Sequence, residues 1–291
     1  MRLIATVLLA MLLAGFGSVQ AVGPKDVLAQ VEATLQLTGT VVVDEQGRAI
    51  RHRLDQGAML EDWLTQFVAR QVDQWQFEPI RVDGKPMVAE VQMYLRLVGH
   101  KEPGDKVRVR IAGTHFGGPN TGPLNYYPRI AQMTPPEFPK APLRIGGQGI
   151  VYLVVQIGRD GRVLNLGIEQ TNLRTAGTER QMKMMREDFE SAAIRQARHW
   201  TFTPPSTGLL VNDESWLLRV PIEFALSGPR GRVSTLGQWD SYIPGPRNVD
   251  MPWAADQLRS AGAPDALPAQ IGAYPLTQGI KLLTKLSEAN P

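Results

Sequence analysis

Two regions of the chain contain the same five-residue pattern, Trp-x-Phe-x-Pro, and this repeat constrains the fold more than any other feature. The pattern stands at Trp75–Pro79 and again at Trp200–Pro204. Each copy follows a stretch of helical periodicity and precedes a long alternation of apolar and polar residues. Similarity between two regions of one chain is typical of a duplicated structural unit. The sequence therefore predicts two copies of one small unit.

The first region has the order strand, turn, helix, strand. Alternating apolar residues predict a strand at Leu35–Val43, and Gly47 fits a turn that needs a positive φ. Apolar residues at spacings of three and four between Leu60 and Trp75 predict an amphipathic helix. A long alternating run closes the region, with apolar residues at Val91, Met93, Leu95 and Leu97.

The second region repeats this order. A strand is expected at Val151–Ile157, followed by a turn at Gly161. Thr178 and Gln181 form a capping-box pattern that predicts the start of a helix. The last predicted strand has apolar residues at Trp216, Leu218, Val220, Ile222 and Phe224.

Matching distances along the chain support the duplication. In both regions the last residue of the first strand precedes the turn glycine by four positions, from Val43 to Gly47 and from Ile157 to Gly161. In both, sixteen positions separate the Trp from the final strand, from Trp75 to Val91 and from Trp200 to Trp216. The distance from turn to Trp is 28 positions in the first region and 39 in the second. The extra 11 residues correspond to about three helical turns, so a longer second helix is expected.

The aromatic residues of the repeated pattern are the predicted structural core. A Trp at the end of the helix and a Phe two residues later both reach the space between helix and sheet. An aromatic side chain buries about 150–250 Å² and so dominates a small core. The following proline ends the helix. The predicted core residues are Trp75, Phe77, Trp200 and Phe202.

Four motifs of the second region stand in a recognisable order. They are Pro135-Pro136-Glu137-Phe138-Pro139, Gly147-Gln148-Gly149-Ile150-Val151, Asp160-Gly161-Arg162-Val163 and Trp200-Thr201-Phe202-Thr203-Pro204. Together they resemble the C-terminal domain of TonB-type energy transducers, which typically shows Pro-x-Tyr-Pro, Gly-x-Val, Asp-Gly-x-Val and Trp-x-[Phe/Tyr]-x-Pro. Phe138-Pro139 stands where that family usually has Tyr-Pro. The resemblance covers roughly residues 135–224; the first region matches more weakly and lacks the Pro-x-Tyr-Pro motif.

The resemblance implies a mode of action. TonB-like domains bind a short extended segment of outer-membrane transporters by adding it to the free edge of their sheet, where unpaired N–H and C=O groups are available. The alternative is that the last strand only covers its own core. Carried over to this sequence, the candidate partner-binding residues are Phe138, Pro139, Trp216, Leu218, Val220, Ile222 and Phe224.

The N-terminus resembles an export signal. Arg2 precedes a nearly pure apolar run from Leu3 to Phe16, and Val19-Gln20-Ala21 fits a cleavage site. The run is shorter than the roughly 20 residues that span a bilayer. A periplasmic protein is therefore expected, with an inner-membrane anchor facing the periplasm as the alternative. The chain has no cysteine, which excludes lipidation at cysteine, disulfides and thiol metal sites.

The predicted fold class is α+β, with two tandem β-α-β modules that contain small antiparallel sheets. The expected divisions are a signal peptide or anchor at 1–21, module 1 at 35–98, a Pro/Gly linker at 99–134, module 2 at 135–226 and an irregular, extended tail at 227–291. Within the linker, Lys106–Ile111 alternates basic and apolar residues, which indicates a charge-protected edge strand or a binding strand. The tail either wraps back onto the modules, anchored by Trp239, Tyr242 and Trp253, or occupies the edge that a partner needs.

The sequence argues against catalysis. No Gly-x-Ser-x-Gly, Ser-x-x-Lys or His-Glu-x-x-His motif is present, and none of the four histidines has a partner at metal-ligand spacing. No metal, cofactor or catalytic residue is expected. The net charge of +3 is too small to indicate a nucleic-acid partner.

Two functions are compatible with these sequence features. The first is a periplasmic TonB-like protein-binding module in a TonB-dependent transport system, which recognises its partner by β-strand addition. The first candidate partner is a TonB-dependent outer-membrane transporter; the inner-membrane motor is a partner only if the N-terminus is retained. The second is a structural or assembly protein of the periplasm, whose modules pair with each other or form a homodimer.

Overall fold

The computed structural model describes residues 31–82, 84–101, 107–117, 126–208, 210–226, 236–268, 272–276 and 280–286. The expected signal peptide at 1–21 lies outside these residues. None of the helices within these ranges combines the length and the apolar character that crossing a bilayer requires.

Two antiparallel sheets and their helices make up the protein, which confirms the α+β class. The first sheet contains β1 (Glu32–Val43), β2 (Ala49–Leu54), β5 (Ala89–Lys101), β6 (Val107–Phe116) and β12 (Trp239–Tyr242). The second contains β8 (Gly149–Gly158), β9 (Val163–Leu173), β11 (Ser215–Phe224) and β13 (Tyr274–Pro275). Short pairs join β3 (Arg81–Val82) to β4 (Lys85–Pro86) and β7 (Arg129–Gln132) to β10 (Thr201–Thr203). The helices are η1 (Gly57–Met59), α2 (Asp62–Val72), α3 (Lys140–Arg144), α4 (Glu179–Ala197), α5 (Ala255–Ser260) and η2 (Pro264–Ala266).

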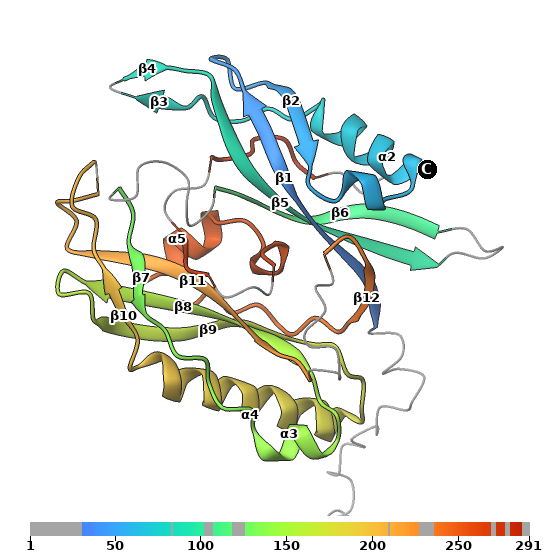
Figure 1. Cartoon of the computed structure of the whole chain (residues 1–291), viewed down its shortest axis with the longest axis vertical. Coiled ribbons are helices and arrows are strands. Elements are labelled where there is room, and N and C mark those ends of the chain that lie inside the picture. Colours follow the sequence, from blue (N-terminus) through green and yellow to red (C-terminus); the bar gives the residue numbers. More distant parts are fainter. Residues whose placement is uncertain are drawn as a thin grey trace, which may run out of the picture.

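The two modules have the same order of elements. In each, a hairpin is followed by a helix and then by a strand that pairs with the first strand of the hairpin: β1, β2, α2 and β5 in module 1, and β8, β9, α4 and β11 in module 2. Figure 1 shows α2 and α4 on opposite outer sides of the molecule, so the sheet faces without these helices look toward each other.

A close backbone contact explains why the turn glycine and the Trp-x-Phe pattern occur together. Gly47 and Gly161 have φ of 83° and 75°, as the turn prediction required. A Cβ atom on either glycine would lie about 2 Å from the carbonyl oxygen of Phe77 or Phe202, respectively. The Phe amide in turn donates to the glycine carbonyl, at 2.6 Å in module 1 and 2.8 Å in module 2. Only glycine fits this place.

The helices follow their apolar stripes. α4 begins with the expected capping box, in which Thr178 and Gln181 each bond the other's backbone N–H. Its buried side chains include Met182, Met185 and Phe189, which pack on the second sheet. The additional residues of module 2 do not all lie in the helix: α4 has 19 residues against 11 in α2, and β9 has 11 against six in β2.

The sheet register corrects one of the sequence spacings. Val43 and Ile157 stand at the same place before their turns, and Val43 lies opposite Ala89 whereas Ile157 lies opposite Trp216. The structural counterpart of Trp216 is therefore Ala89, two residues before Val91. A shift of two positions keeps every side chain on its face, so alternation alone cannot detect it.

The segment expected as a linker, 99–134, contains two strands. β5 continues to Lys101, and β6 pairs with it along the whole length of β6. Val107 lies opposite Lys101 at one end, and Phe116 lies opposite Met93 at the other. β7 pairs with β10 at the end of the Trp-x-Phe-x-Pro pattern of module 2. Since β6 extends the first sheet, this part of the segment belongs to the sheet rather than to a linker.

The segment expected as an irregular tail is an ordered arm over much of its described length. We use "arm" for the described residues between 236 and 286. It contributes β12, α5, η2 and β13 and packs between the two sheets (Figure 1). One apolar cluster joins Tyr94 of the first sheet, Tyr152 of the second and Leu267 of the arm. A second surrounds Leu258 with Val154 and Leu217.

The arm also forms backbone pairings with both modules. β12 pairs with the start of β1, and the next residue, Ile243, exchanges two backbone hydrogen bonds with Leu173 of β9. Farther on, Leu282 forms a bridge with Phe77. Leu282 thus pairs with the Phe of the Trp-x-Phe pattern in module 1, as Ile130 of β7 pairs with Phe202 in module 2. The arm therefore provides to module 1, through one isolated bridge, backbone pairing at the place where β7 pairs in module 2.

Candidate functional site

The candidate partner strand is β11. It pairs with β8 along its whole length: Ser215 lies opposite Gly158 at one end, and Phe224 lies opposite Gly149 at the other. The side chains of Trp216, Leu218, Val220, Ile222 and Phe224 are buried in the core beneath α4. They face the helix because alternate residues of a strand share one face. Contact with a partner on this strand is consequently limited to its backbone edge.

The second part of the candidate site lies at the start of module 2. The ring of Phe138 packs edge-on against Phe189 and Phe224, with 5.8 Å between ring centres in both pairs. Pro139 is the N-cap residue of α3 and is partly exposed. The structure thus places Phe138 at one end of the core and close to the end of β11.

The direction of the β11 backbone groups follows from one hydrogen bond. The N–H of Leu276 donates to the carbonyl of Leu217 at 2.9 Å, on the side away from β8. In an antiparallel strand both backbone groups of a residue point to the same side, and the side alternates along the strand. Arg219 and Pro221 therefore also turn their backbone toward this outer edge. Pro221 has no N–H, so it is tolerated at an edge.

The outer edge of β11 is covered over only part of its length. β13 pairs with it at Leu218 and Arg219. Among the residues that the structure describes, no strand pairs with the outer edge beyond Arg219. We call Val220–Phe224 the distal edge. The arm wraps over the modules and takes part of the edge. Of the three aromatic residues expected to anchor it, Tyr242 is buried and Trp253 packs against the cluster around Leu258, whereas Trp239 is 42% exposed.

A cavity of about 190 Å³ lies beside the distal edge. We call it the Trp200 pocket. Four consecutive residues of β11 form one wall, and the segment that follows β7 forms the opposite wall. Trp200 is 2% exposed, and its Nε1 donates to the carbonyl of Thr134 at 2.9 Å, which fixes this segment. The lining residues are Met133, Pro135, Pro136, Trp200, Val220, Pro221, Ile222 and Glu223.

The corresponding edge of module 1 is closed. β5 holds the place of β11, and β6 pairs with it for nine of its residues. The aromatic ring of Phe116, at the end of β6, packs edge-on against Trp75 and Phe77, with 5.5 and 4.9 Å between ring centres. Module 1 thus carries its own added strand, whereas in module 2 no strand of the described ranges pairs with the outer edge of β11 beyond Arg219.

A buried ion pair, which the sequence patterns did not predict, lies on the other face of β11. Arg219 is fully buried and donates to both carboxylate oxygens of Glu169, at 2.6 and 2.8 Å. Glu169 is the extra residue at a register shift between β8 and β9, and such a bulge can turn a side chain to a new direction. A single arginine within the apolar run from Trp216 to Phe224 was the available signal.

The arm joins this ion pair and two others. Arg247 donates to Glu169 at 2.9 Å, and Asp265 forms an ion pair with Arg96, with 3.2 Å between a carboxylate oxygen and Nε. Asp240 contacts Arg174 at 3.1 Å. Each of these arm residues thus joins an ion pair that the sheets already contain. The three groups are Arg219–Glu169–Arg247, Glu32–Arg96–Asp265 and Glu223–Arg174–Asp240.

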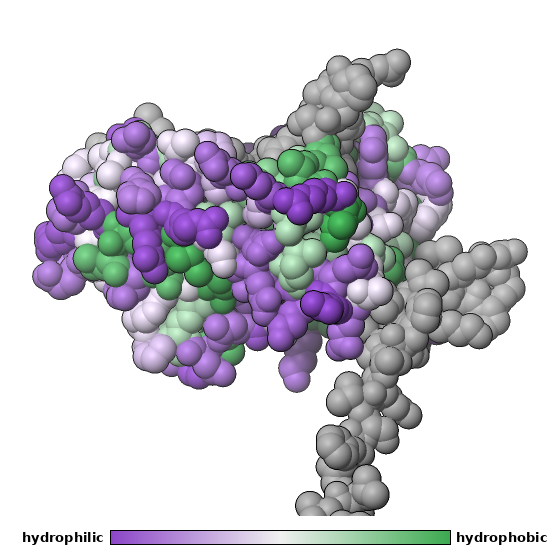
Figure 2. Space-filling view, turned by 90° about the horizontal axis from the view of Figure 1, so that it is seen from below, coloured by the Kyte–Doolittle hydropathy of each residue, from purple (hydrophilic) through white to green (hydrophobic). Residues whose placement is uncertain are grey.

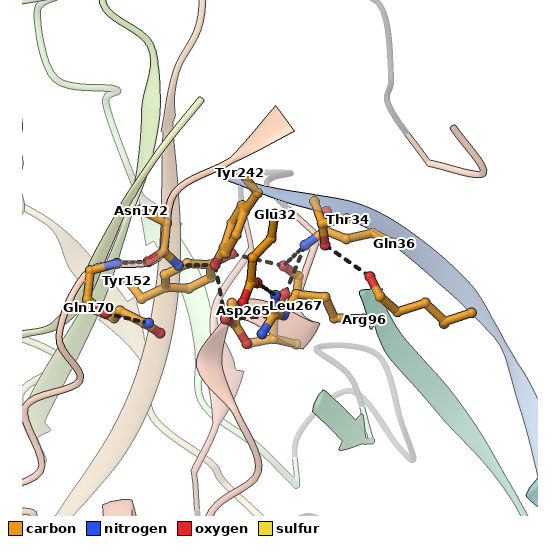
Figure 3. Close-up of polar contacts among 12 residues, drawn as sticks. Glu32, Thr34, Gln36, Arg96, Tyr152, Gln170, Asn172, Tyr242, Asp265 and Leu267 are labelled. Carbon is orange, nitrogen blue, oxygen red and sulfur yellow. Dashed lines mark hydrogen bonds and ion pairs between the residues drawn. The ribbon is translucent and has the colours of Figure 1, made fainter. Parts of the chain in front are cut away.

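Figure 3 shows the polar contacts around Asp265, which lies between the two sheets. Its carboxylate accepts from the Tyr242 hydroxyl at 2.9 Å, and its backbone carbonyl accepts from the Gln36 side chain at 2.9 Å. Tyr242 also contacts Asn172 of β9. Burial, followed by the charge of Asp265, raises the pKa of Tyr242, so this hydroxyl remains a hydrogen-bond donor at neutral pH. The network fixes the arm to both modules.

Acidification is expected to destabilise the protein through His115. Its ring, 7% exposed, packs against Tyr94 and Tyr274. Burial, followed by the nearby charge of Arg219, lowers the pKa of His115 to about 3. Histidine in an unfolded chain has a pKa near 6.5. Between pH 6.5 and pH 3 the unfolded chain therefore binds more protons than the folded protein, and the unfolding free energy decreases as the pH is lowered.

The expected loss between pH 6.5 and pH 5 is about 1.6 kcal/mol of unfolding free energy. Urea denaturation at both pH values measures it. In the matched variant His115→Gln, which cannot titrate at this position, the pH dependence should be smaller by that amount. An equal pH dependence in the two proteins would contradict the assignment.

In the described ranges, no three His, Asp or Glu side chains lie close enough together to hold a metal ion. Figure 2 shows the molecule from below, where hydrophilic residues predominate and interrupt the hydrophobic areas. The helices α3 and α4 lie on this lower side in Figure 1. The candidate site is the distal edge with the Trp200 pocket, because β11 is the strand that the resemblance indicates and the pocket lies beside it.

Comparison with known proteins gives a partial match. No protein-family model matches the chain. Over 97 residues, 33% of its length, the chain is 32% identical to protein TonB of two strains of Xanthomonas campestris pv. campestris. The matched stretch is 36% of those proteins, so the chain spans about a third of the length of the curated relatives it matches. The similarity supports a TonB-like relationship for part of the chain.

Proposed function

From this similarity to TonB, we propose that the protein is a periplasmic, TonB-like protein-binding module of a TonB-dependent transport system. Module 2 binds an extended segment of a partner, with an outer-membrane transporter as the first candidate, by β-strand addition to the distal edge. The protein is not an enzyme. The observation that carries the proposal concerns β11, the strand indicated by the resemblance: among the described residues, strand pairing at its outer edge is limited to Leu218 and Arg219, opposite β13.

The geometry of β11 supports recognition through the backbone. Its helix-facing side chains are buried against α4, and β8 pairs with it along its whole length, so its outer edge has a fixed place in the sheet. A rigid edge recognises an extended segment by main-chain hydrogen bonds, and pockets beside the edge add selectivity for its side chains. The Trp200 pocket lies where such a side chain would enter. An edge protein of this kind needs no cofactor.

Restoring a hydrogen-bond donor at Pro221 is expected to strengthen partner binding. Pro221 turns its backbone to the outer edge but has no N–H to offer an added strand. In Pro221→Val and Pro221→Ala the new N–H should contribute roughly 0.5–1.5 kcal/mol, which lowers Kd by about two- to tenfold. Isothermal titration with a peptide from an extended segment of a candidate TonB-dependent outer-membrane transporter measures the effect.

The two variants control for each other, because they share the new N–H and differ in side-chain size. If only one of them changes Kd, the cause is packing in the Trp200 pocket. A third protein, Pro244→Ala, adds an N–H away from β11 and should leave Kd unchanged. An absence of peptide binding in all proteins, or an unchanged Kd in both Pro221 variants, would reject strand addition at this edge.

One observation favours a second function, a structural or assembly role. The arm packs between the modules and pairs with strands of both, so they are already joined within one chain. Under this alternative the distal edge meets another copy or no partner. Sedimentation analysis at micromolar concentration separates the two functions: a dimer that Pro221→Val strengthens, without transporter-peptide binding, supports assembly.

A further inference from the structure

We infer that β13 is an autoinhibitory strand, which a partner segment displaces when it binds the outer edge of β11, and that module 1 stabilises this closed state through Tyr94 and His115. This inference rests on the proposed function and adds its regulation. The basis is that β13 pairs with the edge that strand addition needs, whereas the aromatic side chains packed against β13 come from the other module.

The distal edge alone gives an added strand few backbone partners. The residues of β11 whose backbone faces outward alternate along the strand, and they are Leu217, Arg219, Pro221 and Glu223. Only the last two belong to the distal edge, and because Pro221 has no N–H, they carry at most three backbone hydrogen-bonding groups. Leu217 and Arg219 carry four more, and these face β13. A partner that relies on main-chain hydrogen bonds therefore needs the place of β13.

The backbone pairing of β13 with β11 is short. β13 is two residues long, and one of them, Pro275, has no N–H. Pro275 lies opposite Leu218, and the ladder ends where Tyr274 lies opposite Arg219. Gly272 and Ala273, the described residues that precede β13, do not continue this ladder. So short a ladder can be exchanged for another strand without unfolding the sheet, because β8 pairs with the opposite edge of β11 along its whole length.

Side chains of module 1 stabilise β13 in addition to this ladder. Tyr94 of β5 and His115 of β6 lie opposite each other in the first sheet. The ring of Tyr274 stands edge-on to both, with 5.7 Å between its centre and that of Tyr94, and 6.0 Å to that of His115. Tyr274 is 4% exposed. Edge-on ring contacts stabilise such an arrangement beyond simple burial.

The strand β6 thus contributes to both modules. On one face Phe116 closes the edge of module 1, where its ring packs against Trp75 and Phe77. The neighbouring residue His115 points to the opposite face, because side chains alternate along a strand, and there it contacts the ring of Tyr274. A module whose own edge is closed therefore acts on the edge of the other module.

Tyr94→Leu in module 1 is the first test. We expect it to lower the Kd of the transporter peptide by about two- to tenfold, because the closed state loses a ring contact and the share of protein with an open edge rises. The control is Val68→Ala, which removes buried groups from α2 on the other side of the first sheet and should leave Kd unchanged. Isothermal titration measures both, after circular dichroism has shown that each variant is folded.

A disulfide between β13 and β11 is the second test. The chain has no cysteine, so the double variant Leu217→Cys/Leu276→Cys can form only one disulfide within the chain. The N–H of Leu276 donates to Leu217, and both side chains belong to the cluster around Leu258. Opposed residues of paired strands lie about 4.5–5.5 Å apart at Cα, a distance that a disulfide spans. The oxidised protein should bind the transporter peptide at least about tenfold more weakly than the same protein after reduction.

The outcomes separate this inference from the proposed function. If the peptide binds and responds to Pro221→Val while oxidised and reduced protein bind it equally, strand addition at the distal edge stands and autoinhibition by β13 fails. An unchanged Kd in folded Tyr94→Leu would overturn the role of module 1. If none of these proteins binds the peptide, the reduced double variant included, both the inference and the proposed function fail.

Discussion

Replacing Glu169 with leucine is expected to lower the unfolding free energy by about 3–5 kcal/mol, because it leaves a buried charge without its partner. Arg219 has no exposed surface, and both of its bonds to a carboxylate are made to Glu169. Arg247 also loses its carboxylate, but its side chain is 31% exposed and can be hydrated. Urea denaturation at neutral pH measures the change.

The matched control removes both charges. In the double variant Glu169→Leu/Arg219→Met, apolar side chains replace the pair, and most of the lost stability should return, since replacing a whole buried ion pair is often neutral or stabilising. The single variant Arg247→Ala should cost less than either single change at the buried pair. A loss below 1 kcal/mol in Glu169→Leu would show that water or a rearrangement satisfies Arg219.

The second large effect is expected for Trp200→Ala, at about 3–5 kcal/mol, the usual range for large-to-small substitution in a core. The substitution removes a buried ring from the junction of α4, β10 and β11, and it also deletes the hydrogen bond to Thr134 that holds one wall of the Trp200 pocket. Both partner binding and stability should therefore decline. Chemical denaturation and peptide titration measure the two effects.

An exposed tryptophan provides the control. Trp63 lies at the start of α2 and is 46% exposed, so Trp63→Ala should change the unfolding free energy by no more than about 0.5 kcal/mol. Peptide binding should be unchanged in this variant. A loss of less than 1 kcal/mol in Trp200→Ala would mean that the core of module 2 does not depend on its aromatic residues.

Sequence periodicity was sufficient to predict the elements of each module. The strand at Val151–Ile157, the capped helix after Thr178 and the turn glycines all appear where the pattern placed them. These features are local: alternation, a cap and a positive φ depend on residues within a few positions of one another. The exact pairing of β5 with β1 was not local, and there the sequence spacing was wrong by two residues.

The candidate site could be predicted only in part. The resemblance identified β11, but its named side chains lie in the core, and the available surface is its backbone edge. How much of that edge is open depends on β13, which is more than 40 residues away in the chain. No pattern within β11 indicates whether a distant segment pairs with it.

The sequence alone determined the repeated strand-turn-helix-strand order and the aromatic core of each module, because periodicity and turn geometry are written in neighbouring residues. Only the tertiary structure decided which edges are closed: β6 covers module 1, and the arm joins both modules through Arg247, Asp265 and Asp240. The physical reason is that edge pairing uses backbone groups that every residue carries. Its specificity therefore comes from long-range packing and buried charge pairs rather than from a local motif.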